Sequence, residues 1–226
     1  MRTGLTIEPG RTAVLFIDLQ EEHRQDQRFL VEGFDRVVAN AAQLQAAARR
    51  SGVALFHWAY VVDLDRTRRP FHPVLADGTS AFSDKGDPWT AICAEVAPAA
   101  GEASFVKAEA SAFGPDEPER SLKSRGIEWL IVAGVWTEAC VDATVKDALR
   151  RGFRVLLVKD ACGSGTQAMH ETALLNLANR LYGGAVVVTS AACRLIEGLA
   201  AEAWQPQSPV PLRFTYDNAT ALYRDL

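Results

Sequence analysis

Six short apolar runs, each separated from the next by helical or polar stretches, constrain the fold more than any other feature of this sequence. The runs lie at residues 12–19, 53–61, 103–107, 128–135, 153–161 and 185–189. Continuous apolar runs of this length are typical of strands that are buried on both faces of a sheet. Strands that alternate with helices predict right-handed crossovers and a mostly parallel sheet, so the fold class is α/β.

The length of 226 residues favours one domain, since it supports one sizeable core and is short for two. The last predicted helix covers residues 190–204, and we expect the domain to span residues 1–203. Residues 204–226 follow as a C-terminal extension, in which residues 205–226 carry three aromatic side chains. Apolar residues in such a tail need a partner surface, so we expect the extension to pack at a subunit interface in a homodimer or homotetramer.

Charge and composition exclude several classes of protein. The net charge of -4 offers no basic surface for nucleic acid, and no apolar run reaches the roughly 18 residues of a membrane span. The first residues lack the long apolar region of a signal peptide, so we expect a cytoplasmic protein. The four cysteines form no CxxC pair, which argues against a zinc ribbon and for free thiols.

Three reactive side chains fall where predicted strands end. Asp18 and Lys107 close two strands, and Cys140 lies a few residues beyond a third, at the start of a helix. Each alone has an ordinary explanation: a helix cap, a solvated lysine or an inert thiol. Together they are chemically complete, because a helix N-terminus and a lysine lower a thiol pKa, a carboxylate accepts its proton, and backbone N–H groups of the turn bind an oxyanion.

Four segments resemble the isochorismatase-like cysteine hydrolases, and they occur in that family's order. They are "AVLFIDLQ" around Asp18, "KAEASAF" from Lys107, "GIEWLIVAGVWTEACVDATVKDA" around Cys140 and "VLLVKDACGS" from Val155. The resemblance implies a three-layer αβα fold with a six-stranded parallel sheet. It also implies an Asp18–Lys107–Cys140 triad, a cis peptide bond between Val135 and Trp136, and an oxyanion hole made by the backbone amides of Trp136 and Cys140.

Two departures from that family narrow the expected chemistry. The nicotinamidase branch carries a D-x-H metal pattern after the second strand, which "HWAYVVDLDRTRRPFHP" lacks. We therefore expect no metal and no other cofactor, and we interpret His57 as a packed or hydrogen-bonded histidine. The isochorismatase branch proper has no nucleophilic cysteine, so Cys140 favours the amidase side of the family.

The sequence thus predicts a cysteine-dependent hydrolase that cleaves an amide, ureido or carbamoyl C–N bond of a small molecule through a covalent acyl-enzyme. A vinyl-ether hydrolase of the isochorismatase type and a non-catalytic protein of the same fold are the alternatives.

The long connection over residues 62–103 reads as a lid or pocket wall, with an ordinary surface excursion as the alternative. His170 lies in a predicted helix and, like His23, is a candidate for contact with substrate. The expected substrate-binding residues are Gln20, His23, Trp58, Trp89, Phe113 and Trp136.

Overall fold

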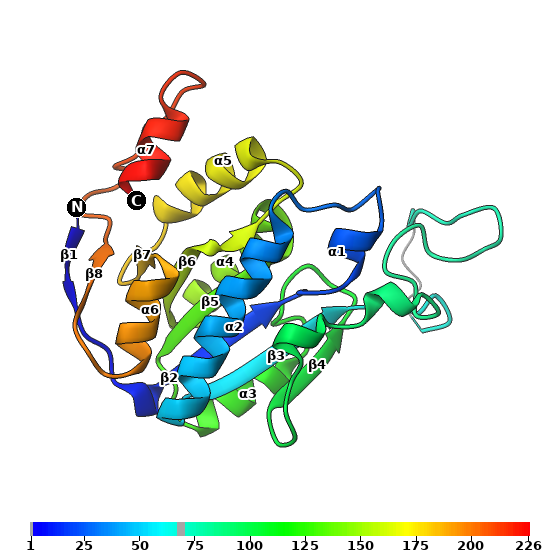
Figure 1. Cartoon of the computed structure of the whole chain (residues 1–226), viewed down its shortest axis with the longest axis horizontal. Coiled ribbons are helices and arrows are strands. Elements are labelled where there is room, and N and C mark those ends of the chain that lie inside the picture. Colours follow the sequence, from blue (N-terminus) through cyan, green and yellow to red (C-terminus); the bar gives the residue numbers. More distant parts are fainter. Residues whose placement is uncertain (1, 67–70) are drawn as a thin grey trace.

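One eight-stranded sheet organises the computed structural model, which describes residues 2–66 and 71–226 (Figure 1). The strand order is β1-β8-β7-β6-β5-β2-β3-β4. The strands are β1 (Arg2–Leu5), β2 (Thr12–Ile17), β3 (Ala54–Tyr60), β4 (Ala103–Lys107), β5 (Trp129–Val135), β6 (Arg154–Gly163), β7 (Ala185–Val187) and β8 (Ala201–Trp204).

All six expected strands form, and they pair with one another in parallel. The expected strand number was nevertheless too low by two, because β1 and β8 add an antiparallel pair at the β7 edge. The helix predicted over residues 190–204 forms as α6 (Thr189–Ile196), which ends well before residue 204. Gly198 follows it with φ 76°, a conformation that stops a helix and frees "AEAW" to pair as β8.

Helices cover both faces of the sheet, which gives the expected three layers (Figure 1). Side chains of β2 alternate between two cores: Val14 and Phe16 face one, and Leu15 and Ile17 face the other. The first core is closed by α2 (Phe34–Ser51) and α6. The second is closed by α3 (Asp116–Ser124), α4 (Asp142–Arg150), α5 (Gln167–Ala178) and the C-terminal α7 (Ala219–Asp225).

The C-terminal extension packs on its own chain. Asn179 exchanges two hydrogen bonds of 2.8 Å with the backbone of Leu212, and α7 lies beside α5 (Figure 1). Leu212 and Leu226 are buried in the second core. The extension therefore has an intramolecular role, and its contact with a second subunit stays a prediction.

Within residues 2–66 and 71–226, none of the helices combines the length and the apolar composition that crossing a bilayer requires.

Candidate active site

Asp18 stands at the carboxyl end of β2, where the chain turns sharply. Its φ is 53°, a left-handed conformation that aspartate tolerates better than most residues. Its backbone N–H donates to the carbonyl of Trp58 at 3.1 Å, which ties this turn to the end of β3. The carboxylate is thereby held rigidly at the edge where ligands bind in parallel α/β sheets.

Lys107 is the last residue of β4, and its ammonium meets Asp18. Lys107 Nζ lies 2.7 Å from Asp18 Oδ2, and the two side chains are only 1% and 3% exposed. The ammonium also donates to the carbonyl of Glu109 at 3.1 Å and sits 4.7 Å from the ring centroid of Tyr60. These contacts fix the position of the positive charge.

Cys140 lies in a π-helical turn, Thr137–Val141, that leads directly into α4. The expected cis bond between Val135 and Trp136 is present just before it. The end of β6 braces the turn, because Thr137 Oγ1 donates to the carbonyl of Gly163 at 2.9 Å. Wide π turns of this kind occur frequently at functional sites.

The electrostatics of the three groups differ from the sequence-based expectation. Burial raises the pKa of the Asp18 carboxyl, and Lys107 opposes that rise. Burial alone would lower the pKa of Lys107, but the charges of Asp18 and Cys140 outweigh it and raise that pKa. Burial and the Asp18 carboxylate raise the pKa of Cys140 to about 12, against the influence of Lys107.

The expectation of a lowered thiol pKa was therefore wrong. The ammonium of Lys107 is already paired with Asp18, so its attraction for a thiolate is largely cancelled by the neighbouring carboxylate. In the free protein Cys140 is a neutral thiol beside an ion pair, and an attack by its sulfur requires that its proton be removed during the reaction.

A cavity of about 440 Å³ opens onto Cys140 and Asp18. Its walls combine aromatic rings with a few polar groups. The aromatic residues are Phe29, Tyr60, Phe82 and Trp136, and the other lining residues are Glu22, His23, Arg28, Ser83, Ala110, Val135 and Ala139. A cavity of this size and lining suits a small molecule with an apolar body.

Two of the expected substrate-binding residues, His23 and Trp136, line this cavity. The indole Nε1 of Trp136 lies 3.3 Å from Nδ1 of His23. Burial lowers the pKa of His23 to about 4, so its imidazole is neutral near pH 7. The pair forms a polar but uncharged part of the wall.

The other four expected residues lie elsewhere. Trp58 and Phe113 are buried in the second core, and the amide of Gln20 donates to the backbone carbonyls of Tyr60 and Thr90. Trp89 is 41% exposed, on a short 3-10 turn of the long connection. The expectation that these four residues line the pocket was therefore wrong, because their side chains face the interior or the surface instead.

The long connection supplies a wall of the cavity through Phe82 and Ser83. It is anchored at the end of β3, where the N–H of Val62 donates to the carbonyl of Ser83 at 2.7 Å. The aromatic residues of this segment were the sequence signal for such a role. Glu22 and Arg28 gave no such signal, because the run "EEHRQDQR" resembles a solvated surface.

A Tyr223–His170–Thr137 chain of hydrogen bonds links the C-terminal helix to the π-helical turn that holds Cys140. Nδ1 of His170 lies 2.8 Å from Thr137 Oγ1, and Nε2 lies 3.1 Å from the hydroxyl of Tyr223. His170 lines a separate cavity of about 500 Å³ rather than the one at Cys140. Its position indicates support of the turn, not contact with a ligand at the thiol.

Two groups of side chains bear on metal binding. His57 is buried with its Nε2 3.2 Å from Glu102, which confirms the interpretation of a hydrogen-bonded histidine. Among the described residues, ligand atoms of Glu21, Cys93 and Glu95 come within 4.8 Å of one another. Arg24 already supplies a positive charge there, because it donates to both carboxylates. That the reaction needs no metal stays a prediction.

Comparison with known proteins assigns residues 12–192 to the Isochorismatase domain. N-carbamoylsarcosine amidase of Arthrobacter sp is 29% identical and aligns with 84% of this chain and 73% of its own length. Maleamate amidohydrolase of Pseudomonas putida is 31% identical, over 81% of this chain and 86% of its own.

Solved structures show the same fold. A cysteine hydrolase from Pseudomonas syringae pv. phaseolicola superposes with a TM-score of 0.76 at 22% identity, over 85% of this chain and 95% of that one. An isochorismatase family protein from Desulfovibrio vulgaris gives a TM-score of 0.72 at 28% identity, over 80% and 95% of the two chains.

Proposed function

The chain belongs to the isochorismatase family, and we propose that it is a cysteine hydrolase that cleaves the C–N bond of a small amide, ureido or carbamoyl compound. One observation carries the proposal: the Cys140 thiol and the Asp18 carboxylate, which is ion-paired with Lys107, line the same cavity. The names of the two amide-cleaving relatives support the choice of a C–N bond.

Acylation begins with attack of the Cys140 sulfur on the carbonyl carbon. Asp18 takes the thiol proton as the S–C bond forms, and its raised pKa makes it a stronger base than an ordinary aspartate. The negative charge on the carbonyl oxygen is stabilised by the backbone N–H groups of Trp136 and Cys140. Asp18 then protonates the leaving nitrogen, the C–N bond breaks, and a thioester remains on Cys140.

Deacylation reverses these roles. Asp18 removes a proton from water, the resulting hydroxide attacks the thioester carbonyl, and the C–S bond breaks. The thiolate recovers a proton from Asp18, which restores the starting state. Lys107 keeps Asp18 in place and balances its charge throughout, because it contacts Oδ2 at 2.7 Å.

A panel of small primary amides, ureido acids and carbamoyl compounds, assayed for release of ammonia or amine, tests the proposal. We expect hydrolysis of at least one class by the unaltered protein and loss of nearly all turnover in Cys140→Ser. Cys193→Ser is the matched control, because Cys193 lies on α6, away from the cavity. Hydrolysis that persists in Cys140→Ser would refute the assignment of the nucleophile.

A further inference from the structure

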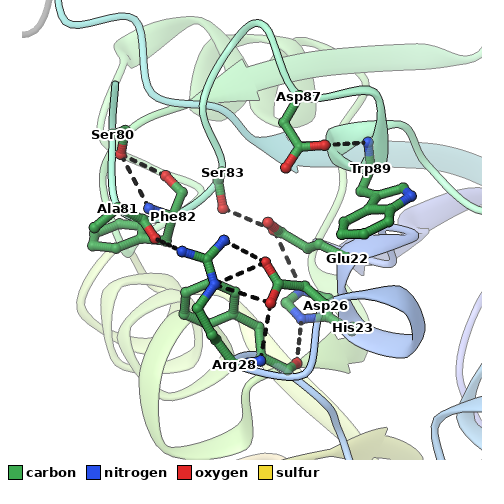
Figure 2. A network of polar contacts seen from close by, with 11 residues as sticks. Glu22, His23, Asp26, Arg28, Ser80, Ala81, Phe82, Ser83, Asp87 and Trp89 are labelled. Atoms are coloured by element: carbon green, nitrogen blue, oxygen red, sulfur yellow. Dashed lines mark hydrogen bonds and ion pairs between the residues drawn. The ribbon is translucent and has the colours of Figure 1, made fainter. Parts of the chain in front are cut away.

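The charges around the active-site cavity are unevenly balanced. Asp18 is paired with Lys107, and burial holds His23 neutral near pH 7. Arg28 is turned toward Asp26, with an Nη2–Oδ2 distance of 2.6 Å (Figure 2). Among the described residues that line the cavity, Glu22 has a carboxyl group with no cationic partner.

Glu22 is held firmly in position. Its side chain is only 4% exposed, and its Oε1 accepts a hydrogen bond of 2.7 Å from the hydroxyl of Ser83 (Figure 2). Nε2 of His23 lies 3.8 Å from the same oxygen, too far for a hydrogen bond. A buried carboxylate that receives one neutral hydrogen bond is poorly compensated, so a cation at this place would bind favourably.

Aromatic rings surround the same space. Phe29 and Phe82 meet edge to face with their centroids 6.3 Å apart, and Tyr60 lies 6.0 Å from Phe82. The faces of such rings attract cations: Arg28 lies 5.1 Å from the ring centroid of Phe29 and Lys107 lies 4.7 Å from that of Tyr60. Rings of this kind together with a carboxylate recur in sites for amines. The described lining residues thus combine an apolar surface with a single carboxyl group that has no cationic partner.

We infer that Glu22 is the specificity-determining residue of this site and that the substrate is a small amide whose apolar body carries a protonated amine. The amide end faces Cys140, the apolar body lies against Phe29 and Phe82, and the ammonium donates to Glu22. The identity of the substrate rests on the proposed function, whereas the preference for an ammonium ligand does not.

The alternative interpretation of this part of the cavity is that Arg28 binds an anionic group of the substrate. Arg28 donates to both carboxylate oxygens of Asp26 and to the carbonyl of Ala81, so the Arg28–Asp26 pair carries no net charge. A substrate carboxylate would have to compete with Asp26 for the guanidinium and would approach Glu22. The described charges therefore favour the cation.

Three ligands without a scissile bond separate these readings: benzylamine, benzyl alcohol and benzoate, titrated calorimetrically into the unaltered protein at pH 8. We expect benzylamine to bind at least about tenfold more tightly than either of the others, as one charge-assisted hydrogen bond implies. Equal affinities, undetectable benzylamine binding or a preference for benzoate would overturn the inference.

Glu22→Gln tests directly whether the charge of Glu22 binds the amine, because glutamine keeps an oxygen for the Ser83 hydroxyl but has no charge. We expect it to abolish the preference for benzylamine. Glu21→Gln, whose carboxylate binds Arg24 outside the cavity, should retain that preference. A preference that survives in Glu22→Gln would show that another group binds the amine and would overturn the inference.

Hydrolysis assays distinguish this inference from the proposed function. The substrates are benzamides with an aminomethyl, hydroxymethyl or carboxyl group at the 4-position. If amides are cleaved without preference for aminomethyl, the proposed function holds and the inference fails. If benzylamine binds through Glu22 while no amide or ureido compound is cleaved, the ligand preference holds and the proposed function fails.

Discussion

The ammonium of Lys107 and the carboxylate of Asp18 lie 2.7 Å apart in an almost completely buried ion pair. Burial and the Asp18 carboxylate raise the pKa of the neighbouring Cys140 thiol against the influence of Lys107, so the thiol stays protonated near pH 7. In the mechanism that we propose, Asp18 accepts the thiol proton while Lys107 holds its carboxylate in place.

Removal of Lys107 should leave Asp18 as an uncompensated buried carboxylate. We expect Lys107→Met to lower the free energy of unfolding by about 3–5 kcal/mol at pH 8, measured by urea denaturation. The loss should shrink at pH 5, because without its cation the Asp18 pKa rises further and the carboxyl takes up a proton as the pH falls.

The matched control is Lys146→Met, because Lys146 is 59% exposed in its ion pair with Asp142. It should change stability by no more than about 1 kcal/mol. A loss for Lys107→Met that is equally small at pH 8 would contradict the account of the buried pair.

The close approach of β5 to β2 depends on Gly134. Its φ is 134°, and an added Cβ would lie 2.1 Å from the carbonyl oxygen of Ile17. We expect Gly134→Ala to destabilise the protein by at least about 3 kcal/mol and to abolish activity. Gly10→Ala, which meets no atom within 4 Å, should change the melting temperature little. Equal melting temperatures for the two variants would be inconsistent with this packing.

The stability of the protein should respond to pH through Glu22. Burial is the main reason why the pKa of Glu22 rises from 4.5 to about 7 in the folded protein. The folded state therefore holds the proton of the Glu22 carboxyl group more tightly than the unfolded chain does. Ionisation of Glu22 thus costs stability as the pH rises from about 4.5 to 7. Glu22→Gln removes that cost. Its free energy of unfolding should exceed that of the unaltered protein by an amount that grows from pH 4.5 and reaches on the order of 2–3 kcal/mol at pH 8.

Glu21→Gln should show the opposite sign, because the hydrogen bond from Arg24 lowers the pKa of Glu21. The Glu21 carboxylate stabilises the fold above its unfolded pKa, and that stability is lost as the pH falls through the folded value. Thermal melts from pH 4 to 8 compare the two variants. Parallel profiles would contradict the assigned environments.

The C-terminal extension should also contact a second subunit. Light scattering should give the mass of a dimer or tetramer, and Tyr216→Ser should shift it toward smaller species, because Tyr216 is fully exposed within the extension. Tyr182→Ser, at an exposed site outside the extension, is the control. A monomeric mass for the unaltered protein would contradict this prediction.

Local patterns were sufficient to predict the parallel core of the fold. Each of the six parallel strands is short and mostly apolar, and each was found near its predicted bounds. The antiparallel edge was missed because β1 and β8 are four residues each and depend on mutual pairing. The helix predicted over residues 190–204 was too long for the same reason: it forms as α6 up to Ile196, and the last predicted residues belong to β8.

The site was predictable only where reactive groups stand at strand ends. Asp18, Lys107 and Cys140 could be named from the sequence, but the raised pKa of Cys140 follows from burial and from an ion pair that only the fold creates. Glu22 was hidden in a polar run for a related reason. Its burial depends on Ser83, which lies 61 residues away on the long connection.

The most direct measurement of the central claim is the intact mass of the protein, quenched in acid during turnover of a cleaved amide. The account predicts a population that carries the acyl group of the substrate, located on Cys140 by peptide mapping and absent from Cys140→Ala. Full turnover by Cys140→Ala, or an acyl group mapped to Cys93, Cys162 or Cys193, would contradict it.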